Sequence, residues 1–352
     1  MCGIIGLLNK DGSRIDGRSI KRGLSIMNER GNGQGAGFAA YGIYPDYEDY
    51  YAIHVFLDNM KEAKANVERE IERWGYIVYS EEIPTNDIRT FEREQIPYRY
   101  FFKPDTRKLL GHNYDEKDAI VKMVMRINSK REGSLVFSCG KNMGIFKAAG
   151  WPEEVANFYK IEDYDAYMWI GHNRYPTNTP GWWGGAHPFG LLDWSVVHNG
   201  EITSYGTNKR YVESFDYECS MLTDTEVVTY LFDLLVRRHG LTPEMAGKAL
   251  APRFWKEIDR MPEKQRLHHT ALRLAYSSAE INGPFAIIVA RSEGFIALTD
   301  RIKLRPLVLG KKDNTVYVSS EEAAIRSMEP NLSEVIYPTA GEPVVETLDV
   351  VL

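Results

Sequence analysis

The first eight residues, from Met1 to Leu8, constrain the fold of this 352-residue chain more than any other stretch. Removal of Met1 would leave Cys2 at the N-terminus, where its free α-amino group, with a pKa near 7.7–8.0, could accept the proton of its own thiol. Residues 3–8 form an apolar run with the length of a strand, which would hold this terminus in place. The pattern fits both a catalytic N-terminal thiol and a buried cysteine at the start of a strand, and position alone does not separate them.

Composition narrows the class of protein. Hydrophobic residues make up 43% and charged residues 26%, enough apolar material for one large domain or two ordinary ones. The formal net charge is −6 and the basic residues are dispersed, so we expect no nucleic-acid partner. Cys2, Cys139 and Cys219 are too few for a disulfide framework and lack metal-ligand spacing, which indicates a reducing cytoplasm. Because neither a signal peptide nor an apolar run of about 18 residues is present, no membrane association is expected.

Periodicity predicts helices and strands along the whole chain. Residues 17–30 have helical spacing, and the following residues 31–37 carry four glycines that permit close approach of backbone to a ligand. Residues 44–133 are rich in Tyr, Glu, Lys and Arg, so we expect a small α+β lobe inserted in the parent domain, with packing or partner contact as its default role. Cys139 lies in an apolar stretch and is expected in the core. Other predicted strands are residues 38–41, 135–140, 168–173, 194–199, 286–290, 295–298 and 316–318.

Three polar clusters contain side chains suited to chemistry on an amino acid. Arg174 is followed by a proline-fixed turn and suits bidentate recognition of a carboxylate. Asn199 and Gly200 end a predicted strand, where an amide and a backbone N–H could stabilise the oxyanion of an acyl transfer. Asp224 precedes an apolar helical run; it could hold an ammonium group, and it or Thr223 would serve as the helix N-cap. Taken singly, the first cluster could be a surface loop and the second an ordinary turn.

Together with Cys2, these groups are the parts needed to cleave the amide of an amino acid, and glutamine is the obvious substrate. The chain resembles the class II glutamine amidotransferases, whose mature chain begins with the catalytic cysteine. The motifs occur in family order: Cys2-Gly3-Ile4, Glu29-Arg30-Gly31, Gly171-His172-Asn173-Arg174-Tyr175-Pro176-Thr177, His198-Asn199-Gly200-Glu201-Ile202, Asp224, Asp300-Arg301 with Leu304-Arg305-Pro306-Leu307, and Ser319-Ser320-Glu321.

Within that family the chain is most similar to the amidotransferase domain of glutamate synthase. The likeness covers nearly the whole chain and includes the long insertion. It implies an α+β class with the four-layer αββα fold of N-terminal-nucleophile hydrolases, spanning residues 1–352 and carrying the inserted lobe 44–133. The further matching segments are residues 33–37, 174–179, 199–203 with 206–208, and 282–286.

The resemblance also implies roles for individual residues. By position, Cys2 is the nucleophile, and Asn199 with Gly200 forms the oxyanion hole. Arg174 and Asp224 take the positions of the glutamate-binding pair. Three more residues match the loops that close on bound glutamine, namely Arg30, Gly31 and Thr177. Departures from the family pattern affect loop detail: Glu29 stands where histidine is common, and Asn173 and Tyr175 vary the arginine loop.

A full glutamate synthase continues into a synthase domain with FMN and an iron–sulfur centre, and this chain has none of the cysteine clusters such a centre needs. The resemblance therefore implies a free-standing cytoplasmic subunit without a cofactor or metal of its own, which passes ammonia to an FMN-binding synthase subunit and its associated glutamate synthase subunits. The glycines of residues 31–37 suggest a loop that completes the site only when the partner docks. Two alternatives stay open: a subunit of a methylamine–glutamate methyltransferase, and a catalytically silent subunit that senses glutamine.

Overall fold

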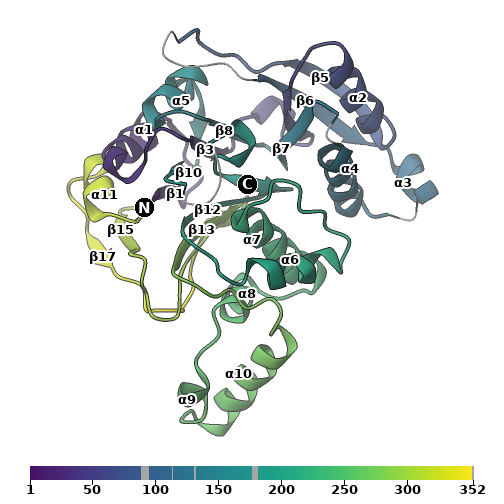
Figure 1. Cartoon of the computed structure of the whole chain (residues 1–352). Helices are drawn as coiled ribbons and strands as arrows, with labels where there is room; N and C mark the ends of the chain where they lie inside the picture. The colour runs from purple at the N-terminus through teal and green to yellow at the C-terminus, as the bar shows by residue number, and fades with distance from the viewer. Residues whose placement is uncertain (89–94, 113, 131, 177–180, 351–352) are drawn as a thin grey trace.

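Two antiparallel β-sheets face each other and carry helices on their outer surfaces in the computed structural model (Figure 1). The structure describes residues 1–88, 95–112, 114–130, 132–176 and 181–350. Strands from the two sheets touch where β1 and β10 meet β12, so the central core lies between the sheets. The expected α+β class and four-layer αββα arrangement are therefore confirmed.

The first sheet has seven strands, and the N-terminal strand β1 is in its interior, paired with β10 on one side and β16 on the other. All seven residues of β1 are buried, because one face meets the outer helices and the other meets the second sheet. This explains why its sequence is a continuous apolar run rather than an alternating one. The strand order is β17 (Glu334–Ile336), β15 (Val308–Lys312), β16 (Thr315–Ser319), β1 (Gly3–Asn9), β10 (Met168–Asn173), β3 (Ala36–Tyr41) and β8 (Met143–Ala148).

The second sheet has five strands and supplies the opposite wall of the core. Its strand β12 pairs with β13, and the register places Gly200 opposite Phe285. The strand order is β11 (Phe189–Leu191), β12 (Trp194–Gly200), β13 (Phe285–Arg291), β14 (Gly294–Thr299) and β18 (Val344–Thr347).

Helices cover both outer faces. The seven-stranded sheet is covered by α1 (Arg18–Ser25), α5 (Pro152–Phe158) and α11 (Glu322–Met328), and the five-stranded sheet by α7 (Asp224–Phe232) and α8 (Pro243–Leu250), with α6 (Tyr205–Glu213) packed on α7. The helix expected over residues 17–30 is shorter, because α1 ends at Ser25 and a 3₁₀ turn, η1 (Asn28–Arg30), follows. Asn173 Nδ2 donates to the Met27 carbonyl at 2.9 Å, which gives that carbonyl a partner outside the helix.

The inserted lobe is a four-stranded sheet with helices, and it lies at one side of the molecule (Figure 1). Its strand order is β5 (Gly75–Glu82), β6 (Ile96–Pro104), β4 (Tyr51–Leu57) and β7 (Ser134–Lys141), with helices α2 (Glu62–Ile71), α3 (Thr106–His112) and α4 (Glu116–Lys130). Strand β7 lies beyond residue 133, so this sheet extends one strand past the boundary read from composition. The apolar sequence of β7 suits either sheet, and only its pairing with β4 assigns it to the lobe.

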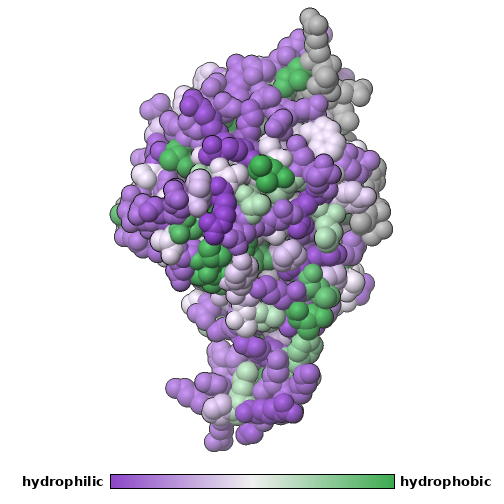
Figure 2. Space-filling model, turned by 90° about the vertical axis from the view of Figure 1, so that its left-hand side faces the viewer, coloured by the Kyte–Doolittle hydropathy of each residue, from purple (hydrophilic) through white to green (hydrophobic). Residues whose placement is uncertain are grey.

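A helical hairpin, α9 (Trp255–Ile258) and α10 (Glu263–Ala275), projects from the body below α8 (Figure 1). The face drawn in Figure 2 is largely hydrophilic, with hydrophobic side chains scattered over it. No helix in the described part of the chain has the length and apolar character needed to span a bilayer. The remaining elements are short: β2 (Ile15–Asp16), β9 (Asp165–Ala166), η2 (Pro45–Tyr47), η3 (Ile161–Asp163), η4 (Trp183–Gly185) and the π-helical turn η5 (Asp233–Arg238), which continues α7.

Candidate active site

The pairing of β1 with β10 brings the N-terminus to the end of the arginine strand. Gly3 lies opposite Asn173 in this register, so Cys2 faces the residues that follow β10. The Tyr175 backbone N–H donates to Cys2 Sγ at 3.3 Å. Cys2 is half-buried, and burial raises the pKa of its thiol, against the opposing effects of the Tyr175 N–H, the N-terminal ammonium and Arg174.

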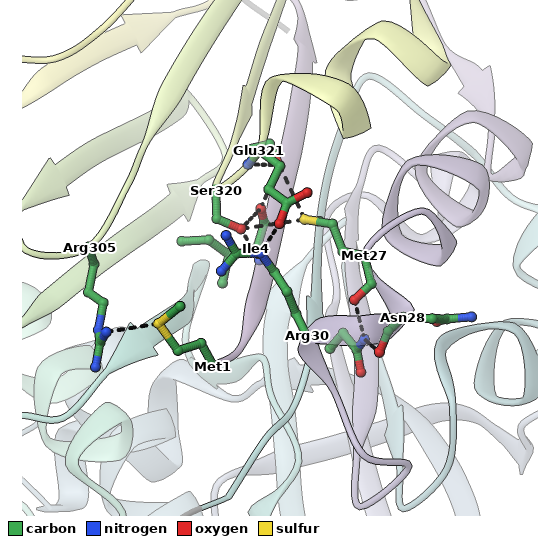
Figure 3. Close-up of polar contacts among 10 residues, drawn as sticks. Met1, Ile4, Met27, Asn28, Arg30, Arg305, Ser320 and Glu321 are labelled. Carbon is green, nitrogen blue, oxygen red and sulfur yellow. Dashed lines mark hydrogen bonds and ion pairs between the residues drawn. The ribbon is translucent and has the colours of Figure 1, made fainter.

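The first residues of β1 are held by the segment that precedes α11 (Figure 3). The Ile4 N–H donates to Ser320 Oγ at 3.1 Å, and the Ser320 N–H donates to the Ile4 carbonyl at 2.9 Å. One step nearer the terminus, Arg305 Nη1 donates to the sulfur of Met1 at 2.9 Å. The two Ile4–Ser320 bonds do not depend on Met1 and hold the strand just after Cys2, and a fixed terminus is what an N-terminal nucleophile requires.

A pocket of about 240 Å³ opens at Cys2 and is lined by residues from five separate parts of the chain. The predicted residues Cys2, Arg174, Gly200 and Asp224 all line it. The other lining residues are Tyr175, Pro176, His187, His198, Glu201, Ile202, Tyr205, Leu222 and Thr223.

The pocket lining includes one arginine and two acidic residues, and the charges of Arg174 and Asp224 are set by their surroundings. Arg174 is buried, and burial lowers its pKa while Cys2 and Asp224 oppose that effect. Burial acts to raise the pKa of Asp224, but His198, the Ile202 N–H and the Thr225 hydroxyl together hold it below its usual value. A guanidinium and a carboxylate on one pocket match the carboxylate and the ammonium of an α-amino acid.

Asn199 and Gly200 end β12 beside this pocket. Gly200 has φ +147°, and a Cβ at this position would lie 1.9 Å from the carbonyl oxygen of Pro284, so the tight approach of the two backbones requires glycine. Asn199 is fully buried, and neither atom of its side-chain amide has a hydrogen-bond partner among the described residues. Its side chain is absent from the pocket lining, whereas Gly200 is present. A buried amide with an unused N–H group is suited to donate to an oxygen of a bound acyl group.

Two of the predicted substrate-binding residues lie elsewhere. Arg30 forms an ion pair with Glu321 next to Ile4 of the N-terminal strand (Figure 3). Arg30 does not line the pocket. Gly31 packs so closely on Asn173 that a Cβ would lie 1.9 Å from its side-chain oxygen. Neither residue lines the pocket here, because these contacts hold the short turn after α1, and their contact with bound glutamine stays a prediction. Thr177 falls outside the described residues.

The loop before α7 is held by side chains from the first turn of that helix. Thr223 is the N-cap, and its hydroxyl accepts the Glu226 N–H at 3.1 Å, as one of the two sequence alternatives allowed. The Glu226 carboxylate does not form the reciprocal capping-box bond with the backbone N–H of Thr223. It accepts the N–H groups of Ser220 and Met221 instead, each at 2.9 Å. Burial raises the pKa of Glu226 to about 7, against the effect of these donors. The carboxylate thus shapes the pocket wall at Leu222.

Sequence reasoning missed a buried group of histidines at the pocket wall, two of which line the pocket. His187 and His172 stack with ring centres 4.0 Å apart, and both His187 and His198 contact the hydroxyl of Thr225. His198 was part of a motif but had no assigned role, and His187 was not singled out. The only local signal was the dipeptide His187-Pro188, which here has a cis peptide bond.

The structure also shows where the two other cysteines lie and whether the described residues could hold a metal ion. Cys139 is buried in the core as predicted, and burial raises the pKa of its thiol to about 12. Cys219 is also buried, and burial raises the pKa of its thiol. Within the described residues, no group of three or more His, Cys, Asp or Glu side chains is arranged to hold a metal ion.

Comparison with known proteins agrees with this geometry. The family model described as "Glutamine amidotransferases class-II" matches residues 45–337, a span that starts after Cys2 and contains Arg174, Gly200 and Asp224. An uncharacterized protein of Archaeoglobus fulgidus is 49% identical, over 99% of this chain and 92% of that one. The glutamine amidotransferase-like protein GlxB of Rhizobium meliloti is 24% identical, over 92% of this chain and 91% of its own length.

A longer relative matches only in part of its length. The large chain of the NADPH-dependent glutamate synthase of Bacillus subtilis is 25% identical, over 85% of this chain but only 21% of that protein. The family model covers well over half of the chain, and relatives align along nearly all of it. The chain belongs to the class II glutamine amidotransferases.

Proposed function

We propose that this chain hydrolyses glutamine to glutamate and ammonia, with Cys2 as the nucleophile, and delivers the ammonia to a partner synthase subunit. One observation carries the proposal. A single pocket gathers a thiol, a buried guanidinium, a carboxylate and a strand-end backbone N–H from Cys2, Arg174, Asp224 and Gly200. These four groups are far apart in sequence, and each matches one group of glutamine or of its reaction.

Substrate binding follows from the charges. Arg174 pairs with the α-carboxylate, and Asp224 accepts from the α-ammonium. The side-chain amide of glutamine then extends toward Cys2, which lines the same pocket. Because Arg174 is buried and Asp224 is partly buried, their attraction for the substrate is screened less than that of fully exposed charges.

The reaction needs two transfers at one carbon atom. The thiol of Cys2 gives its proton to the free α-amino group of the same residue, and the sulfur bonds to the side-chain amide carbon. The oxyanion so formed accepts from the Gly200 N–H and the Asn199 amide. The amide nitrogen takes the proton from the α-ammonium, the C–N bond breaks and ammonia leaves. Water then attacks the thioester and gives glutamate, which restores the thiol.

This scheme requires removal of Met1, because a peptide-bonded nitrogen has no basic lone pair. We therefore expect the mass of the purified active protein to correspond to a chain that begins at Cys2. Intact-mass spectrometry checks this. A fully active protein that retains Met1 would contradict the α-amino base and leave the nucleophile assignment open to a separate test.

Similarity to a longer protein supports the partner. The alignment with the glutamate synthase large chain takes in 85% of this chain but about a fifth of that protein. We therefore propose a partner resembling the FMN-binding synthase part of glutamate synthase, with FMN and the iron–sulfur centre on the partner side.

The test measures glutamate release from glutamine, with and without proteins that co-purify with the chain from its native source. Cys2→Ala is expected to abolish release, and Cys2→Ser to reduce it by at least about a thousandfold, because an alcohol is a far weaker nucleophile than a thiol. Cys219→Ser is the matched control, since Cys219 is outside the pocket, and it should retain activity. Full activity in Cys2→Ala would overturn the assignment. Glutamine binding without turnover in every preparation would favour a silent glutamine sensor.

A further inference from the structure

We infer that Thr225 is a positioning residue that fixes the carboxylate of Asp224 for the α-ammonium of the substrate. The inference rests on the proposed function, because it concerns the same pocket. Thr225 is fully buried and does not line the pocket, whereas Asp224 does. Thr225 would therefore act on the substrate only through its neighbour.

The Thr225 hydroxyl is the centre of a four-membered polar group. Its Oγ1 lies 2.8 Å from His187 Nε2, 3.2 Å from His198 Nδ1 and 3.1 Å from Asp224 Oδ1. The three partners come from three different segments: the loop before β11, strand β12 and the first residue of α7. A single hydroxyl thus ties both imidazole rings to one carboxylate.

The direction of these hydrogen bonds follows from what each group can donate. An ionised carboxylate only accepts, so the 3.1 Å contact is favourable only when the Thr225 proton points to Asp224 Oδ1. The oxygen lone pairs of Thr225 must then accept from the rings. His187 is neutral at physiological pH, because burial and nearby positive groups hold its pKa well below the usual value. Its one N–H is therefore at Nε2, and it donates to Thr225.

This pattern leaves Asp224 with a fixed orientation. Oδ2 accepts the Ile202 N–H at 3.0 Å, and Oδ1 accepts the Thr225 hydroxyl, with His198 Nδ1 a further 3.5 Å away. Both oxygens are held from the protein side, while the carboxylate still lines the pocket. The two ring N–H groups polarise the Thr225 hydroxyl, which strengthens its bond to the carboxylate. The remaining lone pairs of Asp224 are thereby aimed at the pocket.

A purely structural role predicts a different result from substitution. Thr225 is in the first turn of α7, where the N-cap bond is made by Thr223 and needs no Thr225 hydroxyl. Thr229 lies one turn further along the same helix and is equally buried. Its hydroxyl donates to the Thr225 carbonyl at 2.9 Å and does not reach Asp224. Thr229→Val is therefore the matched control for loss of a buried hydroxyl from this helix.

The experiment measures equilibrium binding of two ligands by calorimetry in the Cys2→Ala background, so that turnover does not interfere. The ligands are L-glutamine and its analogue without the α-amino group, 4-carbamoylbutanoate. Thr225→Val and Thr225→Ala should lower the ratio of the two affinities by about tenfold, because only glutamine carries the ammonium. Thr225→Ser keeps the hydroxyl and should restore the ratio, and Thr229→Val should leave it unchanged.

A double variant tests whether Thr225 acts through Asp224. With Asp224→Asn present, Thr225→Val should cause no further loss of the affinity ratio, because the carboxylate is already gone. An unchanged ratio in both Thr225→Val and Thr225→Ala, or an equal loss in Thr229→Val, overturns the inference. Failure of Cys2-dependent glutamate release in the parent would instead reject the proposed function, since the binding ratio does not depend on turnover.

Discussion

Lys147 is a buried lysine, and among the described residues its ammonium group has one carbonyl acceptor and no ion pair. Its side chain has no solvent contact, and its Nζ donates to the Gly184 carbonyl at 3.0 Å and lies 4.3 Å from the centre of the Phe189 ring. Burial lowers the pKa of Lys147 to about 7, and the charge of Arg174 adds to this effect. The lysine thus couples folding stability to pH.

Lys147→Met should stabilise the protein at pH 6 and lose this advantage as pH rises. Between about pH 7 and pH 10 the unfolded chain keeps a proton that the folded chain releases, so stability of the parent rises with pH in that window. We expect a gain of roughly 3 kcal/mol at pH 6 after allowing for the lost hydrogen bond, which turns into a loss of about 1 kcal/mol near pH 10. Guanidinium denaturation at several pH values measures it. Lys141→Met, on a half-exposed lysine, is the control and should show no such trend. An equal destabilisation at every pH would reject the prediction.

Asn199 and Asn128 provide a contrast between two buried amides. Asn128 uses both amide atoms on the backbone of Val136, at 2.7 and 2.9 Å, whereas Asn199 uses neither within the described residues. Asn199→Ala should lower kcat by roughly 10²–10³-fold with little change in KM, because its bond forms to the oxyanion. Asn128→Ala should lower stability and leave kcat in place. Steady-state kinetics with thermal unfolding of both variants distinguishes them, and a normal kcat in Asn199→Ala would remove it from the oxyanion hole.

At the scale of elements, the first turn of α7 organises one wall of the pocket. Its N-cap, its carboxylate at Asp224 and the loop contacts of Glu226 all come from residues 223–226. Leu222, in this loop, has φ +57°, a backbone conformation that a leucine side chain disfavours. The Glu226 bonds to Ser220 and Met221 offset that cost.

Glu226→Gln should loosen this loop without unfolding the helix. The amide can accept only one of the two backbone N–H groups, and its NH₂ would face the other. We expect hydrogen exchange at Ser220 and Met221 to become at least about tenfold faster, since one backbone hydrogen bond is lost. Exchange followed by mass spectrometry measures this. Glu244→Gln, on an exposed helix start, serves as the control, and unchanged protection of both amides in Glu226→Gln would show that the loop is held by other contacts.

At the scale of the whole molecule, the segment after α1 is tied down more firmly than its glycines suggest. Gly37 lies inside strand β3, Gly31 is packed on Asn173, and the backbones of Asn32 and Gly35 are hydrogen-bonded to the backbone of Arg174. Arg30 would have to leave Glu321 to reach the pocket. This ion pair is thus a structural candidate for keeping the lone chain in a less active state.

We expect the lone chain to be a poor glutaminase, and the partner to raise its kcat/KM for glutamine at least about tenfold, or about 1.4 kcal/mol of transition-state stabilisation. Glu321→Gln should raise kcat/KM of the lone chain, because Arg30 loses its ion pair with the Glu321 carboxylate. The increase caused by the partner protein should then be smaller. Glu322→Gln, at the neighbouring residue, is the control. Kinetics of each variant with and without the partner decide the matter. Equal kcat/KM in the lone chain and the complex would reject gating and leave the Cys2 chemistry intact.

Local pattern in the sequence was enough to predict most elements, whereas the main pocket residues also needed the family resemblance. Strands β10 and β12 and the apolar β1 were predicted nearly to their ends, because side-chain periodicity reports how each segment is buried. Cys2, Arg174, Gly200 and Asp224 were predicted because they suit chemistry on an amino acid and because their motifs match the family in order, and all four line the pocket.

Tertiary structure alone decided the contacts between distant segments. Pairing of β7 with β4, the Arg30–Glu321 ion pair and the approach of His187 to Thr225 join residues that no local period relates. The sequence also could not show that the Glu226 carboxylate accepts the Ser220 N–H rather than the Thr223 N–H, because both groups are within reach of its side chain. Periodicity records which face of an element is buried, whereas the partner that each polar side chain finds depends on how separate elements pack.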